Sequence, residues 1–288
     1  MEAKERLYSQ VSHYIEINRY EKAKESLYEI LAIEPNSPRA LFLLAVCLYN
    51  IDKYEESFKV CEEALRNNYS REECYFLLGI NYEALEKYPQ SERNFLEALR
   101  INPQWAQVVA AYSLLMLRTG NHKKAEELMK EAARLDPNGN EIMDYKLRYY
   151  YYVNNKEMHS EALRKYIRDS SDEIKKFLHL SINDLQKKNY KSAKENCKQA
   201  FLLDPTNEYI LLLLKKLDFQ SSKWYMPIVL IEKVGGPAVL WVAMIVTLLI
   251  LRTLKLYSLM IVVAGIYILL CLYSYVISFI YNRKNLKI

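Results

Sequence analysis

The chain has 288 residues, 51% of them hydrophobic, and its 40 basic and 35 acidic residues give a net charge of +5. Most of that excess lies after residue 219, where there are seven basic residues and one acidic residue, so residues 1–219 carry a net charge of −1. A nucleic-acid-binding surface needs clustered lysine and arginine to neutralise phosphates. This charge distribution argues against a nucleic-acid partner, and the low count of 6 glycines favours a continuous helical array.

From the N-terminus onward, residues recur with a period of 34. Four prolines are separated by 68, 34 and 68 residues: Pro35, Pro103, Pro137 and Pro205. A mostly aromatic column falls on the same grid: Tyr20, Tyr54, Tyr88, His122, Lys156 and Tyr190. A fixed period of this length indicates a repeat protein with an extended binding surface rather than an enzyme pocket.

Three further columns follow each member of the aromatic column. The first is mostly small: Ala23, Ser57, Ser91, Ala125, His159 and Ala193. The second, four residues later, is apolar: Leu27, Cys61, Phe95, Met129, Leu163 and Cys197. The third, three residues later again, is mostly small: Ile30, Ala64, Ala98, Ala132, Tyr166 and Ala200. This spacing places the columns on one face of a helix, which we expect to be buried.

The pattern resembles the tetratricopeptide repeat family, whose signature combines a bulky residue, Leu-Gly, Tyr, Ala, Phe and Pro over 34 residues. The third repeat matches best, with Tyr75, Leu78-Gly79, Tyr82, Tyr88, Phe95, Ala98 and Pro103. The fifth, about 140–173, departs at Lys146, Tyr166 and Ser171, which occupy the leucine, small and proline positions. The resemblance covers roughly residues 4–207.

The resemblance implies an all-α, right-handed superhelical solenoid of about six helix–turn–helix repeats. Asp52-Lys53 and Gly120-Asn121 are expected turns between paired helices. Glu208–Phe219 is expected to form a helix that caps the stack. We therefore assign residues 1–219 to the solenoid and its cap, 220–233 to an interfacial linker, 234–281 to a two-helix hairpin and 282–288 to a basic tail.

Two apolar runs end the chain. Val234–Leu251 has 18 residues and Leu256–Tyr281 has 26, and neither contains a charge. A bilayer-spanning helix needs about 20 residues, and only Arg252–Lys255 separates the runs. The sequence therefore predicts an antiparallel hairpin of two transmembrane helices that binds the lipid bilayer through residues 234–281. Two buried core helices of a soluble domain, or a re-entrant pair, are the alternatives.

The charges around the hairpin predict its orientation. Five basic residues lie on the side of the solenoid and tail: Lys223, Lys233, Arg283, Lys284 and Lys287. The loop between the runs carries Arg252 and Lys255. Cytoplasmic segments carry the excess of basic residues, and the first ten residues, MEAKERLYSQ, have no apolar signal-peptide core. We expect an integral membrane protein whose repeat domain and C-terminal tail face the cytoplasm.

The sequence carries no motif for catalysis, for a cofactor or for a metal. Its 4 histidines are well separated, and there is no HExxH, GxGxxG, phosphate loop or CxxC pair. We therefore predict that the protein is not an enzyme and binds no cofactor and no metal.

The resemblance implies that the first helix of each repeat lines a groove. The candidate partner-binding residues are Arg39, Phe42, Val46, Tyr49, Phe76, Ile80, Gln107 and Leu114. Some family members capture the C-terminal carboxylate of chaperones, but the corresponding positions here hold Tyr8, Ser12, Leu43, Glu73 and Leu77, so that clamp is absent. The groove is expected to be apolar and to bind an apolar segment of a partner protein. The alternative is that these side chains pack against neighbouring helices or the cap.

Together these features predict a membrane-anchored adaptor or scaffold that binds a protein or peptide partner at the cytoplasmic membrane surface. One alternative is a structural subunit of a membrane complex that docks through the hairpin. Another is a peptide-sensing regulator, although no output module is visible in the sequence.

Overall fold

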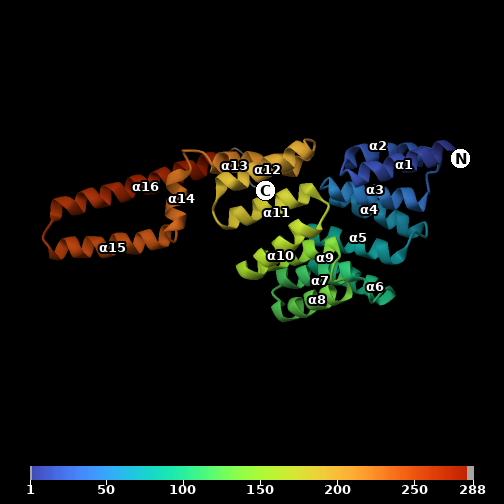
Figure 1. Cartoon of the computed structure of the whole chain (residues 1–288), viewed down its shortest axis with the longest axis horizontal. Helices are drawn as coiled ribbons and strands as arrows, with labels where there is room; N and C mark the ends of the chain where they lie inside the picture. Colours follow the sequence, from blue (N-terminus) through green and yellow to red (C-terminus); the bar gives the residue numbers. More distant parts are fainter. Residues whose placement is uncertain (1, 284–288) are drawn as a thin grey trace. The chain divides into compact units, whose positions relative to one another are not determined.

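The computed structural model describes residues 2–283, and this part of the chain contains sixteen helices and no strand (Figure 1). The chain divides into two compact units, Met1–Ser170 and Ser171–Ile288. The helices of the first unit are α1 (Glu2–Glu16), α2 (Tyr20–Ile33), α3 (Pro38–Asn50), α4 (Tyr54–Arg66), α5 (Arg71–Ala84), α6 (Tyr88–Ile101), α7 (Ala106–Arg118), α8 (His122–Leu135), α9 (Asn140–Tyr152) and α10 (Lys156–Asp169). Those of the second unit are α11 (Glu173–Gln186), α12 (Tyr190–Leu203), α13 (Glu208–Gln220), α14 (Met226–Lys233), α15 (Pro237–Thr253) and α16 (Tyr257–Arg283).

The period of 34 residues sets where paired helices begin and turn. Each member of the aromatic column is the first residue of the second helix of a pair, from Tyr20 of α2 to Tyr190 of α12. Two residues earlier the backbone is left-handed, at Asn18, Asp52, Glu86, Gly120, Asn154 and Lys188. The residue between donates its N–H to a carbonyl five positions back, as Lys53 does to Leu48 at 2.9 Å and Asn121 to Met116 at 2.8 Å. This is the hydrogen bond of a Schellman helix end, and the expected turns at Asp52-Lys53 and Gly120-Asn121 are confirmed.

The three small-and-apolar columns form the buried face of the second helix of each pair, from α2 to α12. No residue in them is more than 4% exposed. Gly79 of α5 shows why the signature glycine is needed, because a Cβ there would lie 2.5 Å from the ring of the buried Phe95. The three columns therefore predict the buried residues correctly, and the small residues within them allow the helices to pack closely.

The divergent repeat still folds as a helix pair. α9 and α10 pack against each other, and Tyr166, which occupies a small-residue position, is buried. The first compact unit ends at Ser170, next to Ser171, which stands where the pattern expects a proline. The departure from the signature thus coincides with the boundary between the two units.

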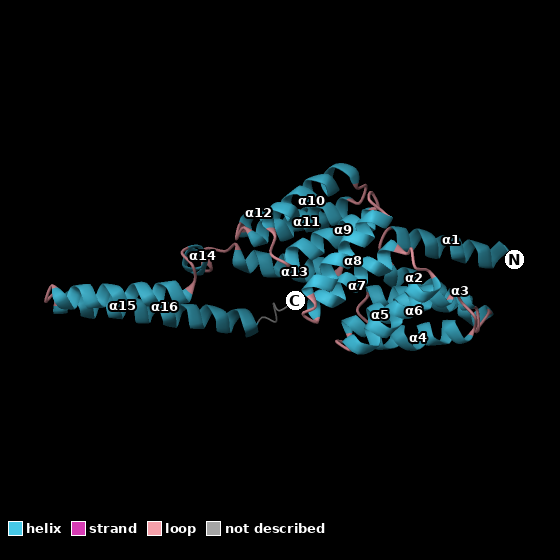
Figure 2. Ribbon diagram, turned by 90° about the horizontal axis from the view of Figure 1, so that it is seen from below, coloured by secondary structure: helices cyan, strands magenta, loops and turns pink. Residues whose placement is uncertain are grey.

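In the second unit, α11 and α12 form another pair, and α13 packs on α12. Ile210, Leu213 and Leu217 of α13 are buried. The last two helices do not continue the repeat. α15 and α16 lie side by side and antiparallel (Figures 1 and 2), and the chain reverses between them at Lys255, whose φ is 57°.

The apolar helices correct part of the prediction of two transmembrane helices. One segment, Tyr257–Ile277, is long and apolar enough to cross a membrane, and 6% of it is buried. The left-handed Gly235 and Gly236 end the preceding helix, so α15 starts at Pro237 rather than Val234 and has only 17 residues. α15 alone is too short to count as a membrane span. It reaches the required length only when α14 is counted with it, and the two helices are bent by 76° relative to each other. Most of this segment is exposed within the chain, so the structure does not support the alternative of two buried core helices.

Candidate partner-binding surface

The first helices of successive pairs form one continuous layer in the first unit. α3 packs on α5, α5 on α7 and α7 on α9. Side chains that project from the same side of these four helices can therefore meet, although they come from distant parts of the sequence.

Five residues of this layer lie together, and we call them the polar cluster: Tyr49, Glu83, Arg118, Tyr145 and Arg148. The Nε of Arg118 lies 3.2 Å from Oε1 of Glu83, joining α7 to α5, and the Glu83 side chain is only 12% exposed. Nη2 of Arg118 donates to the Tyr152 hydroxyl of α9 at 3.5 Å. Arg148 is an exposed residue, and its guanidinium lies 5.4 Å from the ring centre of Tyr145, which is a cation–π contact.

The charges of the cluster act on one another across all four helices. Burial raises the pKa of the Glu83 carboxyl, and Arg118 and Arg148 oppose that rise. Burial lowers the pKa of Arg148, but Tyr145, Asp144, Glu83 and Tyr49 outweigh it, so that the pKa is raised. Both arginines therefore remain charged, and the cluster holds two guanidinium groups around one carboxylate in a partly desolvated position.

The apolar residues predicted to line the groove are mostly engaged in packing. Phe42 is partly buried and stacks on Tyr69, with ring centres 4.3 Å apart. Phe76 is partly buried between α5 and its neighbours, with its ring centre 5.3 Å from that of Trp105. Val46 and Ile80 are also partly buried against the core. These four side chains are therefore only partly accessible from outside.

Three other predicted residues lie in different environments. Leu114 is 2% exposed and belongs to the core around α7, so we leave it out of the proposed surface. Gln107 is half-buried near the start of α7. Arg39 is exposed, with its guanidinium 4.6 Å from the ring centre of Tyr8, so it lies against α1. Of the predicted set, only Tyr49 is part of the polar cluster.

Among the other members of the cluster, Glu83 and Arg148 stand at groove positions, 34 residues after Tyr49 and Leu114, whereas Arg118 and Tyr145 do not. Arg118 lies one residue beyond Leu117, the position 34 residues after Glu83, so counting by the period passes over it. Tyr145 lies one residue beyond Asp144, which continues the groove positions Phe42 and Phe76 at multiples of 34 residues. A search for opposite charges near the ends of successive first helices would have found Glu83 and Arg118.

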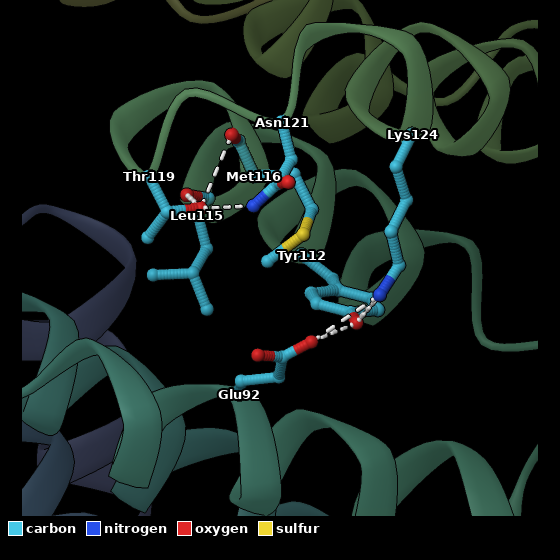
Figure 3. Close-up of polar contacts among 7 residues, drawn as sticks. All are labelled: Glu92, Tyr112, Leu115, Met116, Thr119, Asn121 and Lys124. Atoms are coloured by element: carbon cyan, nitrogen blue, oxygen red, sulfur yellow. Dashed lines mark hydrogen bonds and ion pairs between the residues drawn. The ribbon is translucent and has the colours of Figure 1, made fainter.

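A second polar network joins α6, α7 and α8 (Figure 3). The hydroxyl of Tyr112, whose ring is buried, donates to Oε1 of Glu92 at 2.5 Å, and Lys124 contacts both groups, with its Nζ 3.2 Å from that carboxylate. Beside it, Thr119 donates to the carbonyls of Leu115 and Met116, and Asn121 donates to Thr119 at 3.1 Å. This network ties one helix pair to the next, and its partners satisfy one another.

Among the residues that the structure describes, no group of three histidine, cysteine or acidic side chains is placed to hold a metal ion. The polar cluster offers charge and hydrogen-bond donors on an extended surface.

Comparison with protein families places most of the first unit. Residues 76–140 match the family described as Tetratricopeptide repeat, and residues 17–98 match the one described as Anaphase-promoting complex, cyclosome, subunit 3. Residues 76–140 are therefore similar to tetratricopeptide repeats in sequence. No curated protein was found to match it.

Three solved structures, two of them of tetratricopeptide-repeat proteins, share the fold. A repeat protein from Parabacteroides merdae has a TM-score of 0.59 at 17% identity, over 73% of this chain and 82% of that one. A thermophilic repeat protein of Thermus thermophilus has a TM-score of 0.55 at 16% identity, over 63% and 98%. The APC/C hetero-tetramer Cut9-Hcn1 gives 0.51 at 12% identity, over 74% and 46%. Tetratricopeptide repeats generally mediate protein–protein interactions and are typically non-enzymatic.

Proposed function

We propose that this protein is a membrane-anchored adaptor that binds a segment of a partner protein on the layer formed by α3, α5, α7 and α9. The proposal rests on the presence of two different surfaces in one chain. One is a layer of repeat helices on which Arg148 is an exposed residue, and the other is an apolar helix whose span is 6% buried.

Lipid is the solvent that suits α15 and α16. Large apolar side chains are exposed along both helices, and among the side chains described there only Leu251 and Ile277 are buried large apolar ones. Soluble monomers rarely expose contiguous apolar patches of more than a few hundred Å². We infer that the hairpin is inserted in a bilayer, with the 17 residues of α15 crossing it under local thinning. The predicted basic tail contributes to orientation, but residues 284–288 lie outside the part that the structure describes.

The anchor and the repeat surface act together in this proposal. Membrane insertion raises the local concentration of the binding surface at the bilayer, and a partner held there gains effective affinity without new contacts. On the repeat surface, Arg148 and the rings of Tyr49 and Tyr145 would contact the partner, with the edges of Phe42 and Ile80 beside them. Because the surface includes two arginines and one glutamate, partner binding should weaken as salt rises, which differs from the apolar groove predicted from the sequence.

Affinity capture from detergent-solubilised membranes tests this proposal. The full-length protein and two variants would be compared: Arg148→Ala in the polar cluster and Arg134→Ala on α8. Arg134 is the matched control, since it is exposed and paired with Glu131 of its own helix. Loss of capture with Arg148→Ala but not with Arg134→Ala supports the surface; equal capture by both variants would contradict it.

The orientation is a separate part of the proposal. The basic residues Lys223, Lys233 and Arg283 at one end of the hairpin favour a cytoplasmic repeat domain. Leu254→Cys, in the turn between α15 and α16, should react with an impermeant thiol reagent from outside intact cells. If Leu254→Cys reacted only after the cells are opened, the turn would face the cytoplasm, and the orientation would be the reverse of the proposed one.

A structural subunit of a membrane complex remains a second candidate, favoured by Gly265. A Cβ at this position of α16 would have no heavy atom within 4 Å, so another helix could approach closely there. Cross-linking from Gly265→Cys in membranes to a second membrane protein would favour this role.

A further inference from the structure

We propose that α14 lies in the plane of the membrane surface with one apolar stripe in the lipid, and that it fixes the α11–α13 part of the protein against the bilayer. This inference rests on the proposed insertion of α15 and α16. It concerns Trp224 to Val234, which connects α13 to the hairpin.

The exposed side chains of this segment form a stripe. Met226, Leu230 and Val234 are spaced by four residues, so they lie along one side of the helix. Together with Trp224 they are between 56% and 72% exposed. Ile228 and Glu232 follow two residues after members of the stripe and lie on the opposite side, where they are less exposed. The exposed side of α14 therefore consists of large apolar side chains with Lys233 at its C-terminal end, and the covered side carries Glu232 beside Ile228.

The direction of α14 matches the plane of a membrane. α14 and α15 are bent by 76° relative to each other across the short link at Gly235 and Gly236. Figure 1 shows α14 running across the direction of α15 and α16. If α15 crosses the bilayer, α14 lies nearly parallel to its surface, the orientation of an interfacial amphipathic helix.

A hydrogen bond sets the depth of the segment. The hydroxyl of Tyr273 on α16 donates to the backbone carbonyl of Trp224. Tyr273 lies four residues before the end of the Tyr257–Ile277 span, which is about 6 Å along a helix. Trp224 therefore lies close to the boundary between acyl chains and headgroups, where tryptophan is enriched. This depth distinguishes lipid from a protein partner as the occupant of the stripe.

The opposite side of α14 is held by the turn between α11 and α12. The Tyr190 hydroxyl donates to Oε2 of Glu232 at 2.8 Å, and Nζ of Lys188 donates to the backbone carbonyl of Glu232 at 2.6 Å. The ring of Tyr225 packs edge-on against Tyr190 and Phe219, with ring centres 5.9 Å apart in each case. These contacts make α14 a bracket with one side on protein and the other free for lipid.

The three tryptophans of the chain provide a direct test. Two full-length proteins would be reconstituted in vesicles, one retaining only Trp224 and one retaining only Trp241 of α15, both with Trp105→Phe. The probes are phosphatidylcholines brominated near the headgroup or near the middle of the acyl chains. We expect both tryptophans to be quenched, and Trp224 to lose more emission with the bromines near the headgroup than with those near the middle.

The control separates the two proposals. Quenching of Trp241 without quenching of Trp224 would overturn the placement of α14 and leave membrane insertion intact. Absence of quenching at both tryptophans would overturn insertion and this inference with it.

The bracket itself is tested by the mobility of Trp224. Tyr190→Phe and Glu232→Ala should each lower the fluorescence anisotropy of Trp224, because each removes the hydrogen bond between the hydroxyl and Glu232. Glu232→Gln keeps an oxygen acceptor and should retain the anisotropy of the parent protein. Unchanged anisotropy in Glu232→Ala would show that the contact does not hold α14.

Discussion

α7 and α16 are both apolar helices, yet they meet opposite surroundings. α7 is covered by α5, α6, α8 and α9, and ten of its 13 residues are buried. The segment of α16 that could span a membrane is 6% buried. Apolar composition alone therefore does not say where a helix lies. Repeated small residues that admit neighbouring helices mark α7 as core. The uninterrupted apolar run of α16 lacks that periodicity, which agrees with the lipid contact proposed for it.

The largest expected difference comes from the same substitution in both helices. Leu115 of α7 is 0% exposed and Leu269 of α16 is 67% exposed. Leu115→Ala should lower the free energy of unfolding of the repeat domain by about 2–5 kcal/mol, because it leaves a cavity. Leu269→Ala should change it by less than about 0.5 kcal/mol, as surface substitutions do. Denaturant unfolding of the full-length protein in detergent measures both; equal losses would show that α16 is packed against protein.

A smaller difference is expected at two glycines. Gly79→Ala places a Cβ 2.5 Å from the ring of Phe95 and should destabilise the repeat domain by about 1–3 kcal/mol through overpacking. Gly265→Ala meets open space and should be neutral or stabilising by up to about 1 kcal/mol, since alanine favours helix. Thermal melting of both variants provides the comparison, and destabilisation by Gly265→Ala would reveal a helix packed against α16.

The smallest effect is electrostatic and opposite in sign at two glutamates of the repeat domain. Burial raises the pKa of Glu83 above 4.5, so its contribution to stability is present below pH 4.5 and is lost as pH rises through the raised pKa. Hydrogen bonds from Tyr112 and Lys124 lower the pKa of Glu92 below 4.5, so its contribution is present above pH 4.5 and is lost as pH falls.

Unfolding of Glu83→Gln and Glu92→Gln between pH 3 and 7 reads out these signs. The stability of the parent protein relative to Glu83→Gln should fall with rising pH, and its stability relative to Glu92→Gln should rise. The same slope for both variants would contradict the environments described for the two carboxylates.

The periodic part of the fold was predictable, and the physical reason is local. Paired helices, their turns and their buried columns follow from residues that recur every 34 positions, so Tyr20, Asp52 and Ala98 each occupy the place that the pattern assigns. The length of α15 was overestimated, because the apolar run was counted from Val234, although Gly235-Gly236-Pro237 already marks a break followed by a helix that starts with proline.

The polar cluster could be predicted only in part. Tyr49, Glu83 and Arg148 fall at groove positions of the repeat, but how closely they approach depends on the curvature of four stacked helices, which no single repeat encodes. Leu114 was assigned to the groove because residues at the same position of the repeat line a groove in other members of the family. In this chain the neighbours of α7 cover it on most sides, and Leu114 is buried.

The native cysteines give the most direct test of the claim that lipid surrounds α16. Cys271 of α16 is exposed in the structure, whereas Cys47, Cys61, Cys74 and Cys197 are buried. Thiols react as thiolates, which require water. In intact membranes, Cys271 should therefore resist a water-soluble maleimide and react only after denaturation, with Cys271→Ser as the background and Leu254→Cys as the reactive control. Rapid labelling of Cys271 in intact membranes would contradict the account.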